Sequence, residues 1–183
     1  MRAAATLAYD RVARALHWLN ACLAAIVILL SFGISATPRH SEAREVLLTL
    51  HGSLGLVVLV TMLLWGGWRV RHRSPPLRPM LTRVEVLLAH ATQAGIFLLL
   101  LLMPLTGYAA LAAAGRPVSL FGVVALPTLL PHSDRVAQAA LAMHLAGEFL
   151  VYALVALHIA AALTHGFIRR DGILERMLPG RTR

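Results

Sequence analysis

The chain has few charged residues, one cysteine and no lysine. Charged side chains make up 14% of its 183 residues and apolar ones 58%, whereas soluble domains contain about 25% charged residues. Cys22, the single cysteine, cannot form an intrachain disulfide. This composition excludes a disordered chain, a disulfide scaffold and a soluble nucleic-acid-binding domain.

What is present instead is a set of long apolar segments. Acidic and basic residues are missing from residues 15–36, 46–68 and 86–115, and Glu148 is the exception within 136–168. Each segment reaches the roughly 20 residues that a helix needs to cross a bilayer. We therefore expect one all-α integral membrane domain over residues 1–183, an up-down-up-down four-helix bundle with spans near 13–36, 46–68, 86–113 and 136–168. The proline-interrupted connection 116–135 is expected to be a loop folded over the outer rim.

Arginine placement predicts the orientation. All 17 basic residues are arginine, and 13 of them lie in the N-terminal segment, the connection 69–85 or the C-terminal tail, including Arg2, Arg73, Arg78, Arg181 and Arg183. The positive-inside rule then places both termini in the cytoplasm. This topology accounts for the net charge of +9 without nucleic acid, and arginines beside anionic lipid add membrane affinity. The first apolar stretch is too long for a cleaved signal peptide, and Ile34 is bulky where a small residue is preferred.

The histidines form a pattern. Six of the nine lie within the apolar segments: His17, His51, His90, His144, His158 and His165. Ionisable groups inside a membrane are costly and tend to mark function, although each could instead hydrogen-bond to a neighbouring helix. His144 and His158 are 14 residues apart, about 21 Å of helical rise and close to four turns, so they share one face at two depths.

Helical rise pairs these histidines with others. From the outer ends of their spans, His51 lies ~8 Å in and His144 ~12 Å, whereas His17 lies ~28 Å in and His158 ~33 Å. His165 would lie ~43 Å in and matches His17 less well. Two cross-helix pairs at two depths suit two b-type haems, because low-spin haem iron takes two axial imidazoles. Small residues such as Gly52, Ala21 and Ala161 flank the pairs, as close approach of a cofactor requires.

The whole chain resembles the bacterial cytochrome b561 family, four-span dihaem cytochromes related to the b-type subunits of hydrogenases. The resemblance follows, in order, Ala15-Leu16-His17-Trp18-Leu19, His51-Gly52, Leu88-Ala89-His90, Met103-Pro104-Leu105-Thr106-Gly107, His144, His158 and the stretch 160–165. It implies a bacterial inner-membrane location and haem ligation from spans one, two and four. It also implies electron exchange with a membrane quinone such as ubiquinone, with superoxide a further candidate donor.

Other residues carry weaker assignments. Arg14, Arg69, His90 and His165 lie near the inner end and are candidate contacts for haem propionates or quinone. Each has a plainer alternative: topology signals for the arginines, a helix–helix hydrogen bond for His90 and a solvated interfacial group for His165. Glu148 could carry protons or bond the haem environment, and it could equally be protonated or reach outside water.

Together these observations predict a dihaem b-type cytochrome that transfers electrons between quinone and another redox partner. If the chain acts as an enzyme, it is a quinone-linked oxidoreductase. The same features fit a haem-bearing anchor subunit of a periplasmic dehydrogenase or hydrogenase. A haem-free transporter with histidine-bound Zn²⁺ or Cu²⁺ is the alternative of another class. Two pairs separated by ~21 Å argue against a single metal centre.

Overall fold

Four long helices make up most of the protein. The computed structural model describes residues 8–72, 75 and 81–178. The long helices are α1 (Arg11–Ala36), α2 (Glu42–Arg71), α3 (Arg83–Ala113) and α4 (Asp134–Leu163). All four are long and apolar enough to cross a membrane. The expected all-α, four-span class is therefore confirmed.

Each long helix begins outside its apolar run, at a polar side chain that accepts a hydrogen bond from a backbone N–H of the first turn. These N-caps are Asp10, Ser41, Thr82 and Ser133. At α3, Glu85 completes a capping box by accepting from the Thr82 backbone N–H at 2.8 Å. The caps explain why the helices start two to four residues before the expected spans. Those spans begin where charged residues stop, whereas each helix begins at the hydrogen bond of its N-cap.

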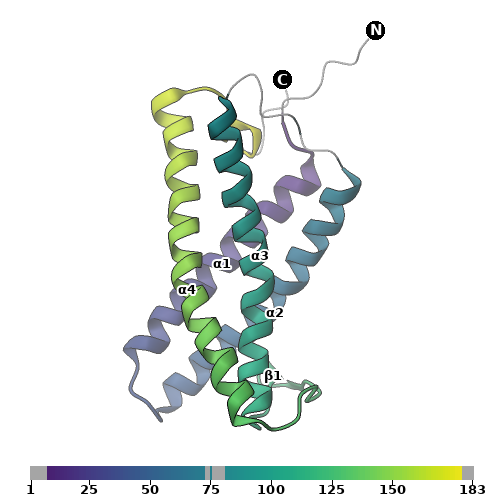
Figure 1. The fold of residues 1–183 in the computed structure, drawn as a ribbon, viewed down its shortest axis with the longest axis vertical. Helices are drawn as coiled ribbons and strands as arrows, with labels where there is room; N and C mark the ends of the chain where they lie inside the picture. Colours follow the sequence, from purple (N-terminus) through teal and green to yellow (C-terminus); the bar gives the residue numbers. More distant parts are fainter. Residues whose placement is uncertain (1–7, 73–74, 76–80, 179–183) are drawn as a thin grey trace.

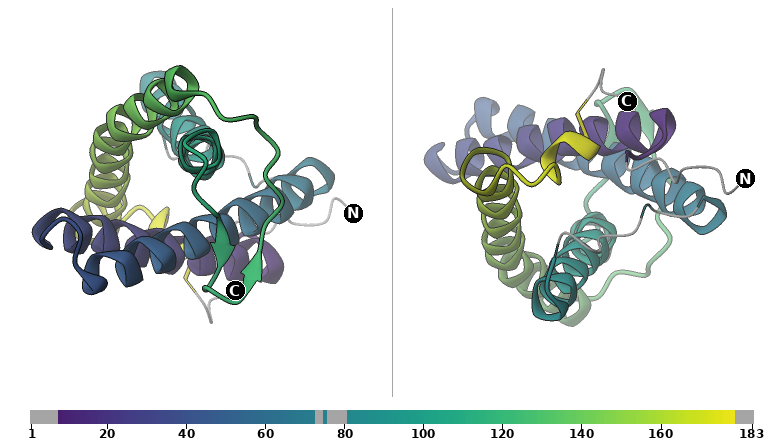
Figure 2. Two further views of the ribbon diagram at one scale, coloured as in Figure 1. Left: turned by 90° about the horizontal axis from the view of Figure 1, so that it is seen from below. Right: turned by 90° about the horizontal axis from the view of Figure 1, so that it is seen from above.

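The helices alternate in direction between two ends of the molecule. The start of α1 and the yellow C-terminal segment lie at the upper end in Figure 1, and the α1–α2 and α3–α4 connections lie at the lower end. α1 packs chiefly against α2 and α3 chiefly against α4, while α2 joins the two pairs through α3. The end-on views in Figure 2 show the α1–α2 pair crossing one side of the molecule with α3 and α4 on the other.

Glycines permit close contact between α3 and α4. A Cβ at Gly147 would lie 2.6 Å from the Met103 sulfur, and one at Gly95 would lie 2.8 Å from a methyl carbon of Leu154. Both distances are below ordinary contact, so a larger residue at either position would require the Met103 or Leu154 side chain to move. Membrane helices associate through such small-residue contacts because lipid supplies no hydrophobic driving force.

The α3–α4 connection is more ordered than the expected loop. It contains a two-stranded antiparallel hairpin, β1 (Ser119–Leu120) and β2 (Val124–Ala125). Phe121 and Gly122 both adopt positive φ, 53° and 72°, which is the geometry of a tight turn. The prolines did not predict the turn within this loop, and the hairpin is held to α2 by a contact distant in sequence. That contact is Ser53, which is fully buried and accepts from the Phe121 N–H at 2.7 Å.

The C-terminal segment folds back over the start of α1. α4 continues into a π-helical turn, η1 (Thr164–Arg169), and a short 3₁₀ helix, η2 (Leu174–Arg176), follows. The Arg14 guanidinium donates to the Leu178 carbonyl at 2.8 Å, and the Trp18 indole donates to the Met177 carbonyl at 2.8 Å. Five arginines that contribute to the charge asymmetry lie outside the described residues: Arg2, Arg73, Arg78, Arg181 and Arg183.

Candidate functional site

The first pair consists of His17 on α1 and His158 on α4. It is called the inner pair because it lies toward the end of the bundle that holds the start of α1 and the C-terminal segment, the end expected to face the cytoplasm. The pair nearer the opposite end is called the outer pair. The ring centres of His17 and His158 are 6.2 Å apart and the ring planes make an angle of 64°. Both side chains are half-buried. Trp18 lies edge-on to His17 at 5.4 Å, and its indole is fixed by the hydrogen bond to Met177. The C-terminal segment therefore covers the side of the molecule on which this pair lies.

The outer pair consists of His51 on α2 and His144 on α4, with ring centres 6.1 Å apart and an interplanar angle of 75°. The Nδ1 atom of His51 lies 3.2 Å from the Val27 carbonyl, and that of His144 lies 2.9 Å from the Met103 carbonyl. A neutral imidazole that donates from Nδ1 to a carbonyl keeps the lone pair of Nε2 for a metal. Both outer rings are therefore held in the tautomer that a metal ligand needs.

Helix α3 contributes no ring to either pair but shapes the outer one. The Thr106 hydroxyl donates to the Met103 carbonyl at 2.9 Å and lies 3.1 Å from His144 Nδ1. A Cβ at Gly107 would come within 3.1 Å of His144 Cε1, so any larger residue there would require the ring to shift by a few tenths of an ångström. Reasoning from the sequence recorded the Met103-to-Gly107 motif without finding this role. The sequence feature that could have indicated this role is the occurrence of Pro104, Thr106 and Gly107 within one helical turn.

The dimensions of both pairs fit a haem. With about 2 Å between a metal and each imidazole nitrogen, and about 1 Å more from nitrogen to ring centre, two rings on opposite sides of one iron would have centres about 6 Å apart. The observed separations are 6.2 and 6.1 Å. Beside His51, a Cβ on Gly52 or Gly55 would meet no protein atom within 4 Å. Such room next to a paired ring suits a porphyrin edge.

The donor set also suits a prosthetic group better than a bare ion. Within residues 8–72, 75 and 81–178, no cluster of three or more His, Cys, Asp or Glu side chains could hold a metal ion. A structural zinc site needs four protein ligands. Two histidines are sufficient where a porphyrin supplies the remaining coordination.

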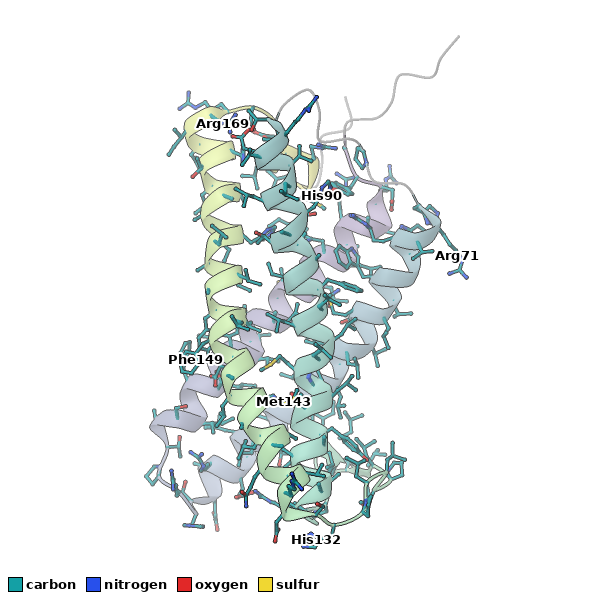
Figure 3. All side chains as sticks on the ribbon, in the orientation of Figure 1. Arg71, His90, His132, Met143, Phe149 and Arg169 are labelled. Carbon is teal, nitrogen blue, oxygen red and sulfur yellow. The ribbon has the colours of Figure 1, made fainter. Side chains whose placement is uncertain are left out.

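The other candidate residues lie toward the end of the bundle that holds the start of α1 and the C-terminal segment. His90 is exposed on α3, in the upper half of Figure 3. His165 binds Asp171, with 2.6 Å between Nδ1 and Oδ2. The Arg69 guanidinium lies 5.3 Å from the ring centres of both Tyr9 and Trp65. Arg14 is buried beneath the C-terminal segment.

Asp171 lies outside the spans, and its environment determines its charge. Burial raises the pKa of this carboxyl. The hydrogen bond from His165 and the charge of the nearby Arg169 guanidinium lower the pKa by a larger amount, so it lies below its ordinary value. Asp171 is therefore ionised at neutral pH. It links η1 to the segment that folds over α1.

These features define a class of protein: a small multi-pass membrane protein with two cross-helix histidine pairs at different depths. A sequence profile described as prokaryotic cytochrome b561 matches residues 8–180. The chain belongs to the prokaryotic cytochrome b561 family, whose members are membrane electron-transfer proteins with haem b.

Curated relatives agree with this assignment. "Cytochrome b561 homolog 2" of Escherichia coli K12 is 29% identical over 170 residues, covering 93% of this chain and 90% of the relative. "Probable superoxide oxidase CybB" of Yersinia pestis is 31% identical over 134 residues, covering 71% and 73%. "Cytochrome b561 homolog 1" of E. coli K12 is 26% identical over 166 residues, covering 91% and 94%.

Proposed function

We propose that the chain holds two haem b groups and transfers electrons in the bacterial inner membrane between quinone and another redox partner. One haem would lie between His17 and His158 at the inner end, and the other between His51 and His144 at the outer end. The observation that carries this proposal is the pair of ring separations, 6.2 and 6.1 Å, at two levels of the bundle.

The protein's own part is to position, orient and shield. α4 supplies one ring to each pair, so it fixes the spacing of the two sites at about 21 Å along its axis. Backbone carbonyls on α1 and α3 orient the outer rings, and the fixed Trp18 limits movement of His17. Bound haem supplies the one-electron chemistry, while burial and hydrogen bonds around the ligands set its potential.

Quinone and superoxide are the proposed small-molecule partners. Quinone follows from the family resemblance, and the candidate contacts Arg14, Arg69, His90 and His165 all lie toward the inner end. Superoxide is suggested by the name of the Y. pestis relative. Anaerobic mixing with ubiquinol and exposure to a superoxide generator would test the two separately. We expect one of these two donors, ubiquinol or superoxide, to reduce the haem, as followed by its optical spectrum. Oxidised quinone should then reoxidise the haem.

The ligand pairing is tested by four single alanine variants of the purified protein. We expect His17→Ala and His158→Ala to leave the same residual haem spectrum, that of the outer site. His51→Ala and His144→Ala should both leave the spectrum of the inner site. His132→Ala is a matched control, since this histidine is exposed at the outer end and lies 3.8 Å from Asp134. A shared residual spectrum for His17→Ala and His144→Ala would overturn the pairing.

A further inference from the structure

The indole N–H of Trp65 on α2 is a buried donor without an acceptor. Its Nε1 atom is enclosed by the protein, and no oxygen of residues 8–72, 75 or 81–178 accepts a hydrogen bond from it. The ring itself is held in place, with the Phe97 ring of α3 centred 5.7 Å away. Buried polar groups nearly always have a hydrogen-bond partner, because an unpaired one loses its water without compensation. A bound group is therefore the expected acceptor.

Arg69, one turn further along α2, presents further donors at the same place. Its guanidinium carbon lies 5.3 Å from the ring centres of both Tyr9 and Trp65. Contact with aromatic rings holds a guanidinium without using its N–H groups. In the described part of the chain, no carbonyl or carboxylate oxygen accepts a hydrogen bond from it. A positioned cation with donors to spare, beside an unpaired indole N–H, suits an anionic oxygen group.

Trp65 lies at the level of the inner histidine pair. α1 and α2 run antiparallel and pack together, and two hydrogen bonds fix their register. The Thr61 hydroxyl donates to Asn20 Oδ1 at 2.7 Å, and nearer the inner end the Trp68 indole donates to the carboxylate that caps α1 at 3.2 Å. Trp65 on α2 and His17 on α1 each lie between these two contacts, one turn from the first.

The other candidate contacts at the inner end are less suited to an anion. Arg14 is buried and donates to a backbone carbonyl of the C-terminal segment. His165 is bonded to Asp171, and His90 is exposed on α3. Arg69 is thus the candidate whose donors are not bonded to another described group and whose neighbour also offers an unpaired N–H.

We propose that the Trp65 indole N–H and the Arg69 guanidinium together bind a propionate carboxylate of the inner haem. The inference rests on the proposed haem between His17 and His158. Haem b carries its anionic propionates at one edge, and a carboxylate within an apolar bundle is costly unless it is paired. One propionate would accept the indole hydrogen bond and be balanced by the guanidinium charge. The two side chains would then also determine which edge of the haem faces α2.

A lipid phosphate offers the same kind of anionic oxygen. It would remain bound whether or not the inner haem is present, whereas a propionate is lost together with the haem. Removal of the inner haem alone therefore distinguishes the two sources.

Ultraviolet resonance Raman spectra of the purified holoprotein report hydrogen bonding at indole N–H groups. The chain has three tryptophans, so the Trp65 band is obtained by subtracting the spectrum of the same protein carrying Trp65→Phe, which keeps an aromatic ring but lacks the N–H. We expect a hydrogen-bonded N–H in the wild type and in His51→Ala, which lacks the outer haem. The N–H should be unbonded in His17→Ala and in His158→Ala, which lack the inner one.

Two results would overturn the proposal: an unbonded Trp65 N–H in a wild type that holds two haems, or a bonded one in both His17→Ala and His158→Ala. The second result would assign the acceptor to a lipid phosphate or another group. A wild type with fewer than two haems per chain would instead contradict the proposed function, and the propionate site with it.

Redox titration tests Arg69 separately. A nearby cation stabilises an added electron, so Arg69→Gln should lower the potential of the inner site and leave that of the outer site unchanged. Arg71→Gln is the matched control, because it removes an exposed arginine from the last turn of the same helix. An inner-site potential that is unchanged in Arg69→Gln, or lowered equally by Arg71→Gln, would overturn the proposal.

Discussion

The outer histidine rings are oriented by helices that contribute no ring to that pair. His51 belongs to α2 but bonds to a carbonyl of α1, and His144 belongs to α4 but bonds to a carbonyl of α3. Helical rise alone predicts which histidines share a level, because rise per residue is nearly constant. It does not predict these carbonyl partners, since they depend on the rotation of each helix about its axis.

Gly107 tests how closely α3 shapes the outer pair. In Gly107→Ala the new methyl group would lie 3.1 Å from His144 Cε1, so the ring must turn or shift. We expect the outer haem to be lost or its spectrum to change while the inner one persists. General unfolding is not expected, because alanine favours a helix over glycine by about 1 kcal/mol. Gly67→Ala, whose Cβ would meet only the Arg71 guanidinium at 4.0 Å, should retain both spectra; equal behaviour of the two variants would contradict the steric role.

At the scale of elements, side chains at the helix ends determine how the chain is tied together. The capping residues lie outside the uncharged runs, so spans defined by the loss of charge begin later than the helices themselves. Ser53 and the C-terminal segment illustrate what sequence patterns could not supply. Ser53 bonds Phe121, 68 residues away, and Trp18 bonds Met177, 159 residues away. Such contacts form only once the bundle has assembled.

Asp171 tests the contribution of the C-terminal segment. Asp171→Asn removes the charged partner of His165 and should lower the free energy of unfolding by about 1–3 kcal/mol at neutral pH. Because the pKa of Asp171 is lower in the folded state than its ordinary value, its stabilisation is present above that ordinary value, about 3.9. It is lost as pH falls through the folded pKa. The midpoints of thermal unfolding for wild type and variant should therefore differ at pH 7 and converge in acid.

The exposed Asp134 provides the control, since 82% of its side chain is accessible. Asp134→Asn should change the midpoint less than Asp171→Asn does. A difference between wild type and Asp171→Asn that persisted below the folded pKa would show that the carboxylate charge is not its source.

At the scale of the whole molecule, the long uncharged segments suffice to predict a four-span, all-α bundle, because backbone groups in lipid must be satisfied within each helix. The crossing of the α1–α2 pair against α3 and α4, seen in Figure 2, was not predictable. It depends on which side chains meet between the two pairs, such as Phe97 of α3 against Gly66 of α2. The sequence thus predicts the level of each histidine, and packing determines how closely the paired rings approach.

The orientation of the bundle is a prediction of arginine placement. Reporter fusions after residue 183 and within 73–80 should report the cytoplasm, and fusions within 37–41 and 126–132 the opposite side, because arginines accumulate on the cytoplasmic side. An external C-terminus would contradict the scheme. It would also exchange the sides on which the two histidine pairs lie.

The most direct measurement is a reduced-minus-oxidised optical spectrum of the purified protein, combined with its haem-to-protein ratio. We expect b-type spectra and two haems per chain, one for each ring pair at about 6 Å. A ratio of one haem per chain would mean that one of the two histidine pairs binds no haem. A folded but colourless protein would contradict the central claim that His17, His51, His144 and His158 are haem ligands.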